Sequence, residues 1–131
     1  LEAIPAIPAL NIARSIAFYR DQVGFNVAHQ EGGFAILRRG AAEIHLWLAN
    51  DESWKHGRPA SPVVSGAESF IPGTASCRVG VEGIDDLYSA IQSTDRIHPN
   101  ARLADQPWGH REFAALDPDG NLITFFQRSG E

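Results

Sequence analysis

The chain has 131 residues, of which 44% are hydrophobic, enough for one globular domain with a buried core and too short for two. Its net charge is −5 and its 11 basic residues are scattered, which argues against a nucleic-acid partner because phosphate binding needs clustered Lys and Arg. The single cysteine, Cys77, excludes an internal disulfide and fits a reducing compartment. The sequence shows no leader and no apolar run of about 18 residues, so we expect a cytoplasmic protein without a membrane span.

The first half of the chain shows the pattern of one strand, one helix and three further strands. The first strand is apolar but contains Pro5 and Pro8, which suits an edge strand or a strand exchanged between subunits, because proline cannot donate to a central ladder. Asn11 can cap the helix, and apolar residues then recur at helical spacing until Gly24 ends it. These elements are expected at residues 4–9, 12–23, 25–30, 34–39 and 43–49.

After an aperiodic connection over residues 50–73, the same order of elements restarts. The last two strands are joined by a turn, Asp117-Pro118-Asp119-Gly120-Asn121, in which proline fixes φ, glycine accepts a positive φ and the Asp side chains bind local backbone. The elements of this half are expected at residues 74–81, 84–93, 102–104, 111–116 and 122–128.

The repeated order predicts an α+β fold made of two βαβββ modules. We expect a single domain over residues 1–131, with an N-terminal half at about 1–49 and a C-terminal half at about 74–128. Neither module can bury its own sheet, so the two should pair edge to edge into a cupped mixed sheet with the helices outside. The concave side is then a cleft that can hold a small molecule.

Strand alternation indicates which side chains face this cleft. In the strand over residues 43–49, the aliphatic residues belong under the helix, and the alternate positions are too polar for a core. Trp108 lies in the loop Gln106-Pro107-Trp108-Gly109, where packing does not obviously require a large ring. The candidate ligand-binding residues are Phe34, Glu43, His45, Trp47, Trp108, Arg111 and Phe113.

Each of these residues also has a purely structural interpretation. An aromatic residue in a strand, such as Phe34, Trp47 or Phe113, is often part of the core. Arg111 and its neighbour Glu112 can form a solvated ion pair that contributes little. Trp54 can simply anchor the long connection, and Cys77 can be an inert buried side chain.

Several segments resemble the vicinal oxygen chelate superfamily, which contains glyoxalases, bleomycin resistance proteins and dioxygenases. They are Asn11-(x)2-Arg14-Ser15-(x)2-Phe18-Tyr19, then Val23-Gly24-Phe25, and later Leu116-Asp117-Pro118-Asp119-Gly120-Asn121. A further segment, Gln106-Pro107-Trp108-Gly109-His110-Arg111-Glu112-Phe113, is similar to the bleomycin-binding resistance proteins. The resemblance implies a homodimer with two ligands in grooves at the subunit interface, with the first strand helping to join the subunits.

The metalloenzymes of this superfamily place His, Gln or Glu ligands at inward positions of three strands. In this sequence the corresponding positions are Ile4, Ser76 and Thr124, and none offers an imidazole or a carboxylate. We therefore expect no metal site and no cofactor. An alternative remains open, in which Glu43 with His45 and His110 with Glu112 converge on a metal.

The sequence shows no Gly-x-Ser-x-Gly elbow, no Cys paired with a nearby His and no phosphate-binding loop. We therefore expect no catalytic residues, and a protein that is not an enzyme. By its resemblance the chain should bind and sequester a bleomycin-family antibiotic, alone or metal-loaded, and confer resistance without turnover. The alternatives are a metal-dependent lyase or thiol transferase with an atypical site, and a protein that sequesters another flat, cationic natural product.

Overall fold

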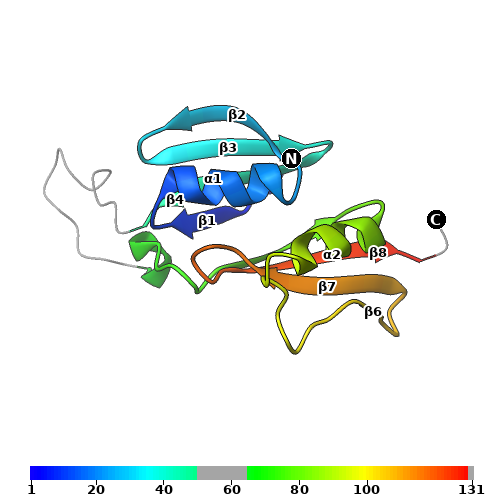
Figure 1. Ribbon diagram of the computed structural model, residues 1–131. Helices are drawn as coiled ribbons and strands as arrows, with labels where there is room; N and C mark the ends of the chain where they lie inside the picture. Colours follow the sequence, from blue (N-terminus) through cyan, green and yellow to red (C-terminus); the bar gives the residue numbers. More distant parts are fainter. Residues whose placement is uncertain (50–64, 130–131) are drawn as a thin grey trace, which may run out of the picture.

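A computed structural model describes residues 1–49 and 65–129 of the chain (Figure 1). The sequence-predicted order of two βαβββ modules is confirmed, and the α+β fold with it. The elements are β1 Ala6–Ala9, α1 Ile12–Asp21, β2 Asn26–Glu31, β3 Phe34–Arg39, β4 Ala42–Leu48, η2 Gly66–Ser69, β5 Ser76–Gly80, α2 Ile84–Gln92, β6 Ala104–Asp105, β7 His110–Leu116 and β8 Leu122–Arg128. Trp54 lies outside the described residues.

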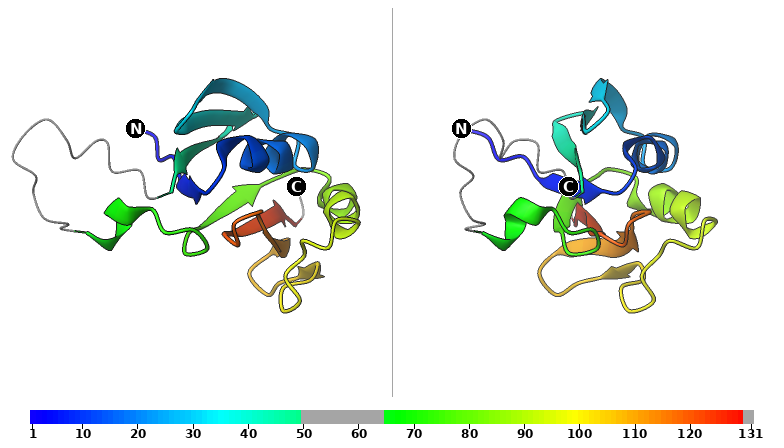
Figure 2. Two further views of the ribbon diagram at one scale, coloured as in Figure 1. Left: turned by 60° about the vertical axis from the view of Figure 1, so that its left-hand side comes forward. Right: turned by 90° about the vertical axis from the view of Figure 1, so that its left-hand side faces the viewer.

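Each half of the chain builds one four-stranded mixed sheet. Sheet A has the strand order β1-β4-β3-β2, and sheet B has the order β5-β8-β7-β6. In both sheets the first strand of the module pairs parallel with its last strand, and the other pairs are antiparallel. The proline-bearing β1 is an edge strand, as its sequence predicted. Both helices lie on the same side of the molecule (Figure 2).

Local sequence explains the first module. The side chain of Asn11 caps α1 by accepting a hydrogen bond from the backbone N–H of Arg14 at 2.9 Å. The helix buries one face, which carries Ile16 and Tyr19, against sheet A. In β4, Ile44 and Leu46 are buried between less buried neighbours, which is the alternation expected of a strand with one face in the core.

The structure also differs from the expected boundaries. The first strand begins at Ala6 rather than at residue 4, and β6 is a two-residue strand at Ala104–Asp105 rather than at residues 102–104. The connection after β4 contains the 3-10 helix η2, capped by Ser65 and Glu68 in a capping box. An element of four residues carries no hydrophobic period, which is why the sequence did not reveal η2.

A buried polar junction joins the two halves. The hydroxyl of Tyr19 in α1 donates to Asp117 Oδ2 at 2.8 Å, and the side-chain amide of Asn121 donates to the carbonyl oxygen of Pro8 at 2.9 Å. Asp117 and Asn121 both lie in the turn between β7 and β8, and this turn is one of the segments that carry the family resemblance. One apolar cluster contains residues of both halves, including Ile7 and Phe125.

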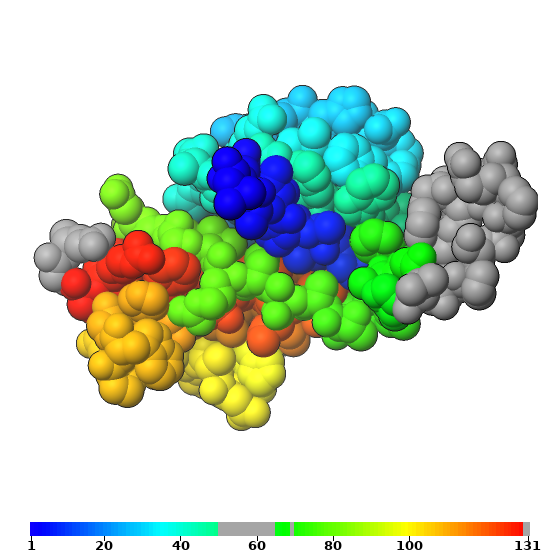
Figure 3. All heavy atoms as spheres, turned by 180° about the vertical axis from the view of Figure 1, so that it is seen from behind, coloured from blue at the N-terminus to red at the C-terminus, as the bar shows by residue number. Residues whose placement is uncertain are grey.

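Seen from behind, the first residues of the chain lie on the surface of the molecule (Figure 3), and residues 1–3 are exposed. Within the described part of the chain, no helix is long and apolar enough to span a membrane.

Candidate functional site

An aromatic cluster occupies the face of sheet A that is not covered by α1. The pairing of β3 with β4 places Phe34 opposite Trp47, with ring centroids 4.6 Å apart, and His45 lies edge-on to Phe34 at 5.2 Å. All three side chains are half-buried. Strand alternation predicted that His45 and Trp47 share one face of β4, and Phe34 of β3 lies beside them on that face. Their part in ligand binding stays a prediction.

Glu43 lies on the same face, and its carboxylate contacts the side chains of Arg38 and His45. Its Oε1 accepts a hydrogen bond from Arg38 Nε at 2.7 Å, and its Oε2 lies 2.7 Å from His45 Nε2. The hydrogen bond from Arg38, followed by the one from His45, lowers the pKa of Glu43. This carboxylate is therefore ionised at neutral pH, and both of its oxygens are engaged.

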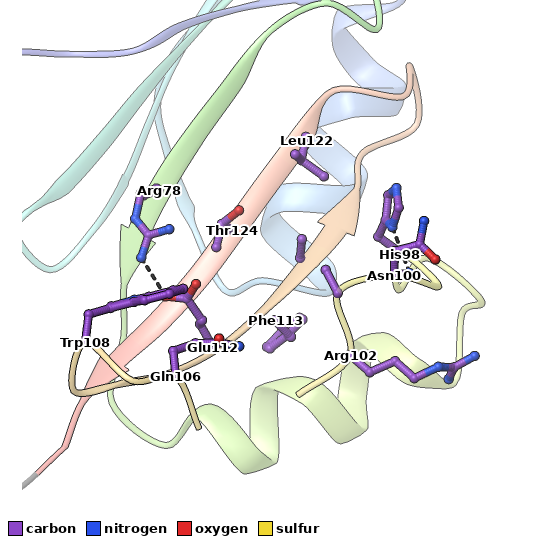
Figure 4. Close-up of a pocket in the computed structure, with 12 residues that line it drawn as sticks. Arg78, His98, Asn100, Arg102, Gln106, Trp108, Glu112, Phe113, Leu122 and Thr124 are labelled. Carbon is purple, nitrogen blue, oxygen red and sulfur yellow. Dashed lines mark hydrogen bonds and ion pairs between the residues drawn. The ribbon is translucent and has the colours of Figure 1, made fainter. Parts of the chain in front are cut away.

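On sheet B, a cavity of about 280 Å³ opens on the face away from α2 (Figure 4). Arg78 of β5, Glu112 of β7 and Thr124 of β8 contribute to its floor. Gln106 and Trp108, from the turn between β6 and β7, form part of its wall. The cavity therefore combines an exposed indole with charged and amide side chains.

Glu112 is the most connected polar residue of this cavity. Only 9% of it is exposed, and its Oε2 accepts hydrogen bonds from Arg78 Nη2 at 2.6 Å and from Trp108 Nε1 at 3.3 Å. His110 Nδ1 lies 3.6 Å from the same oxygen. Burial alone would raise the pKa of Glu112, but the hydrogen bonds from Arg78 and Trp108 and the nearby charges outweigh it and lower the pKa.

Trp108 projects from a tight turn and is 57% exposed. The turn is closed by a hydrogen bond from the backbone N–H of Gly109 to the carbonyl oxygen of Gln106 at 3.1 Å. Gly109 has φ of 84°, a value that glycine adopts without strain. The local sequence thus holds the ring at the edge of the cavity, as its flanking Pro and Gly suggested.

Arg111 and Phe113 lie on the opposite face of β7 from Glu112, because the strand register pairs Phe113 with the buried Phe125. Phe113 is 1% exposed and packs against Tyr88 of α2, but it is also one of the residues that line the cavity (Figure 4). Arg111 is paired with Asp85 of α2 at 2.8 Å, and the part of both residues in ligand binding stays a prediction. Alternation divided β7 into two faces, but only the pairing showed that the face with Glu112 belongs to the cleft.

Two aromatic residues of this region were not among the candidates. Phe70 stacks on Trp47 with ring centroids 5.9 Å apart and an angle of 24° between the rings. Phe126 carries His110 stacked at 4.7 Å and the guanidinium of Arg78 at 5.1 Å. In β8, Phe126 alternates with the buried Phe125, so strand alternation could have placed it on the cleft side. Phe70 comes from the aperiodic connection and left no signal in the sequence.

Ile4, Ser76 and Thr124, the positions that the family resemblance assigns to metal ligands, offer no imidazole and no carboxylate. In residues 1–49 and 65–129, no group of three or more His, Cys, Asp or Glu side chains could hold a metal ion. The pairs Glu43–His45 and His110–Glu112 thus do not converge within the described part of one chain. Each of the two carboxylates is instead bound by an arginine.

Comparison with known proteins gives consistent results. Residues 5–125 match the family profile of the Glyoxalase/Bleomycin resistance protein/Dioxygenase superfamily. A bleomycin resistance protein of Geobacillus stearothermophilus is 54% identical over 128 residues, which cover 98% of this chain and 97% of that protein. A bleomycin resistance protein of Staphylococcus aureus has the same identity and coverage.

Solved structures share the fold at lower identity. The bleomycin-binding protein of Streptomyces verticillus in complex with copper(II)-bleomycin has a TM-score of 0.66 and 23% identity, and the match covers 100% of this chain and 97% of that chain. A lactoylglutathione lyase of Agrobacterium tumefaciens has a TM-score of 0.73 and 15% identity, covering 97% of this chain and 92% of that chain.

Proposed function

The chain belongs to the Glyoxalase/Bleomycin resistance protein/Dioxygenase superfamily, and from this premise we propose that it binds a bleomycin-family antibiotic and confers resistance by sequestering it. The observation that carries the proposal is the pair of aromatic, carboxylate-bearing faces on the two sheets. Phe34 and Trp47 supply flat rings on sheet A, and Trp108 supplies one on sheet B. The 54% identical relatives are bleomycin resistance proteins.

The chemistry of the ligand fits these faces. Bleomycin carries a flat bithiazole, which can stack on aromatic rings such as the exposed Trp108 and the half-buried Phe34. It also carries a cationic tail, which aromatic faces and carboxylates such as Glu43 attract. His45 and Trp47 would line the same groove, and Phe113 would border the cavity of sheet B that it lines. Arg111, which is paired with Asp85 of α2, would support the sheet from behind.

We further propose that the protein is a homodimer, one domain per chain, in which each subunit contributes one wall to each of two grooves. The edge strand β1 and the exposed residues before it are available to border the interface. A stable monomer in sedimentation at micromolar concentration would contradict this assembly. The same proposal places the protein in the cytoplasm, where it would intercept the drug before it reaches DNA.

Sequestration requires tight binding and no turnover. Glu43 and Glu112 both have lowered pKa values and are paired with arginines, so neither is a proton donor at neutral pH. A general base is also most effective when its pKa lies near the operating pH. These two carboxylates therefore suit ligand recognition better than acid–base catalysis.

Calorimetric titration with metal-free bleomycin and with copper(II)-bleomycin tests the proposal. We expect saturable binding of one ligand per chain, and mass spectrometry should recover the drug unchanged after prolonged incubation. Absence of binding, or a chemically modified drug, would contradict sequestration. Lyase and thiol-transferase assays in added Zn²⁺, Mn²⁺ or Ni²⁺ test the enzymatic alternative directly.

A further inference from the structure

We infer that Glu112 is a positioning residue of the proposed bleomycin groove, because it holds the exposed indole of Trp108 in one orientation before the ligand arrives. This inference rests on the proposed function and assigns a role to a residue on the cavity side of β7. It also explains how a ring at the tip of a turn can act as a rigid stacking surface.

The Trp108 side chain makes few contacts that could fix its orientation. The turn fixes its backbone, but 57% of the residue is exposed. Among the described residues, no other aromatic ring stacks on it, and its one hydrogen bond runs from Nε1 to Glu112 Oε2. Without that bond, ligand binding would have to immobilise the ring, and this would weaken affinity.

Glu112 itself is held firmly by its surroundings. It lies within β7, where its strand partner is Phe126, and only 9% of it is exposed. Arg78 Nη2 donates to the same Oε2 at 2.6 Å, and the guanidinium of Arg78 in turn lies over the ring of Phe126. Glu112 is therefore a fixed acceptor for the indole N–H of the exposed Trp108 (Figure 4).

The acceptor oxygen of Glu112, more than its charge, holds the indole N–H. An indole N–H needs only an acceptor in the right place, and a glutamine carbonyl can supply one. Glu112→Gln should therefore retain the orientation of the ring, whereas Glu112→Ala should release it. Asp85→Asn is the matched control, because it removes a carboxylate charge that pairs with the other face of the same strand.

The positioning can be measured without any ligand. In a ¹H–¹⁵N spectrum the indole N–H signal of Trp108 is identified by its loss in Trp108→Phe. We expect Glu112→Ala to shift this signal and to speed its exchange with solvent, and Glu112→Gln and Asp85→Asn to change it little. An unchanged signal in Glu112→Ala would overturn the inference.

A double-mutant cycle on copper(II)-bleomycin binding provides the second test. We expect Glu112→Ala to weaken binding about tenfold in the wild-type background and less than about twofold in the Trp108→Phe background, where no N–H remains to be held. Glu112→Gln should stay within about threefold of the wild type. Equal losses in both backgrounds would overturn the positioning role, because Glu112 would then act independently of the indole.

The two tests separate this inference from the function on which it rests. Wild-type protein that binds no bleomycin would overturn the proposed function and, with it, the purpose of the positioning. Wild-type binding together with an unaffected indole signal would overturn the positioning alone.

Discussion

Replacing Tyr19 by phenylalanine would remove one buried oxygen from the junction between the two halves. Tyr19 is 0% exposed and Asp117 is 1% exposed, so water cannot replace the lost hydrogen bond. The other interactions of the carboxylate remain, because Asn121 Nδ2 donates to Oδ2 at 3.0 Å and the backbone N–H groups of Asp119 and Asn121 donate to Oδ1 at 2.9 Å. The substitution therefore removes one hydrogen bond to a charged group and leaves the aromatic packing intact.

A hydrogen bond to a charged group contributes about 1.5–3 kcal/mol, and we expect Tyr19→Phe to lower the free energy of unfolding by about 2 kcal/mol. For a chain of this size, that corresponds to a fall in melting temperature of about 6–10 °C. Urea denaturation followed by circular dichroism measures the change. A single transition is expected, because the halves share one apolar cluster.

Tyr88→Phe is the matched control. Tyr88 is half-buried, and its hydroxyl has no hydrogen-bond partner among the described residues, so its loss should change the free energy of unfolding by less than about 0.5 kcal/mol. A Tyr19→Phe protein as stable as this control, or two separate unfolding transitions in the wild type, would refute the reasoning.

The same contact predicts an alkaline dependence of stability. Burial, together with the charge of Asp117 and the hydrogen bond to it, raises the pKa of Tyr19 well above its usual value. A raised pKa in the folded state stabilises the protein fully below the unfolded pKa of about 10, and this stabilisation is lost as the pH rises further. The loss above pH about 10 should be smaller in Tyr19→Phe than in the wild type.

Three further predictions concern the site and its surroundings. Trp108→Ala should weaken bleomycin binding by about 1–3 kcal/mol, the range known for stacking of bases on aromatic rings. It should lower the free energy of unfolding by much less than the roughly 3–5 kcal/mol that is typical of a core tryptophan. Unchanged affinity together with a collapsed melting temperature would show that the ring is structural. The lowered pKa of Glu112 stabilises the fold above the unfolded value of about 4.3 and loses this effect as the pH falls, so Glu112→Gln should flatten the acid limb of a stability–pH profile. Burial raises the pKa of the Cys77 thiol to about 11, so iodoacetamide at pH 8 should modify it in urea and not in buffer.

The sequence by itself determined the order of elements and the family. Hydrophobic periods, the Asn11 cap and the turn at residues 117–121 are local signals, because each depends on residues within a few positions of one another. They predicted the repeated module, the edge position of β1 and the face of β4 that carries Glu43 and His45. The exposed place of Trp108 also followed from its neighbours Pro107 and Gly109.

Only the tertiary structure decided which face of β7 belongs to the cleft. Alternation separates Glu112 from Phe113 but is symmetric between them, and the choice depends on which residue of β8 each one meets. Phe125 is buried in the core, so its strand partner Phe113 also turns to the core, where it packs against Tyr88 of α2, and Glu112 turns toward Arg78 and Trp108. Those contacts join residues up to 34 positions apart, and no local pattern in the chain encodes such a distance.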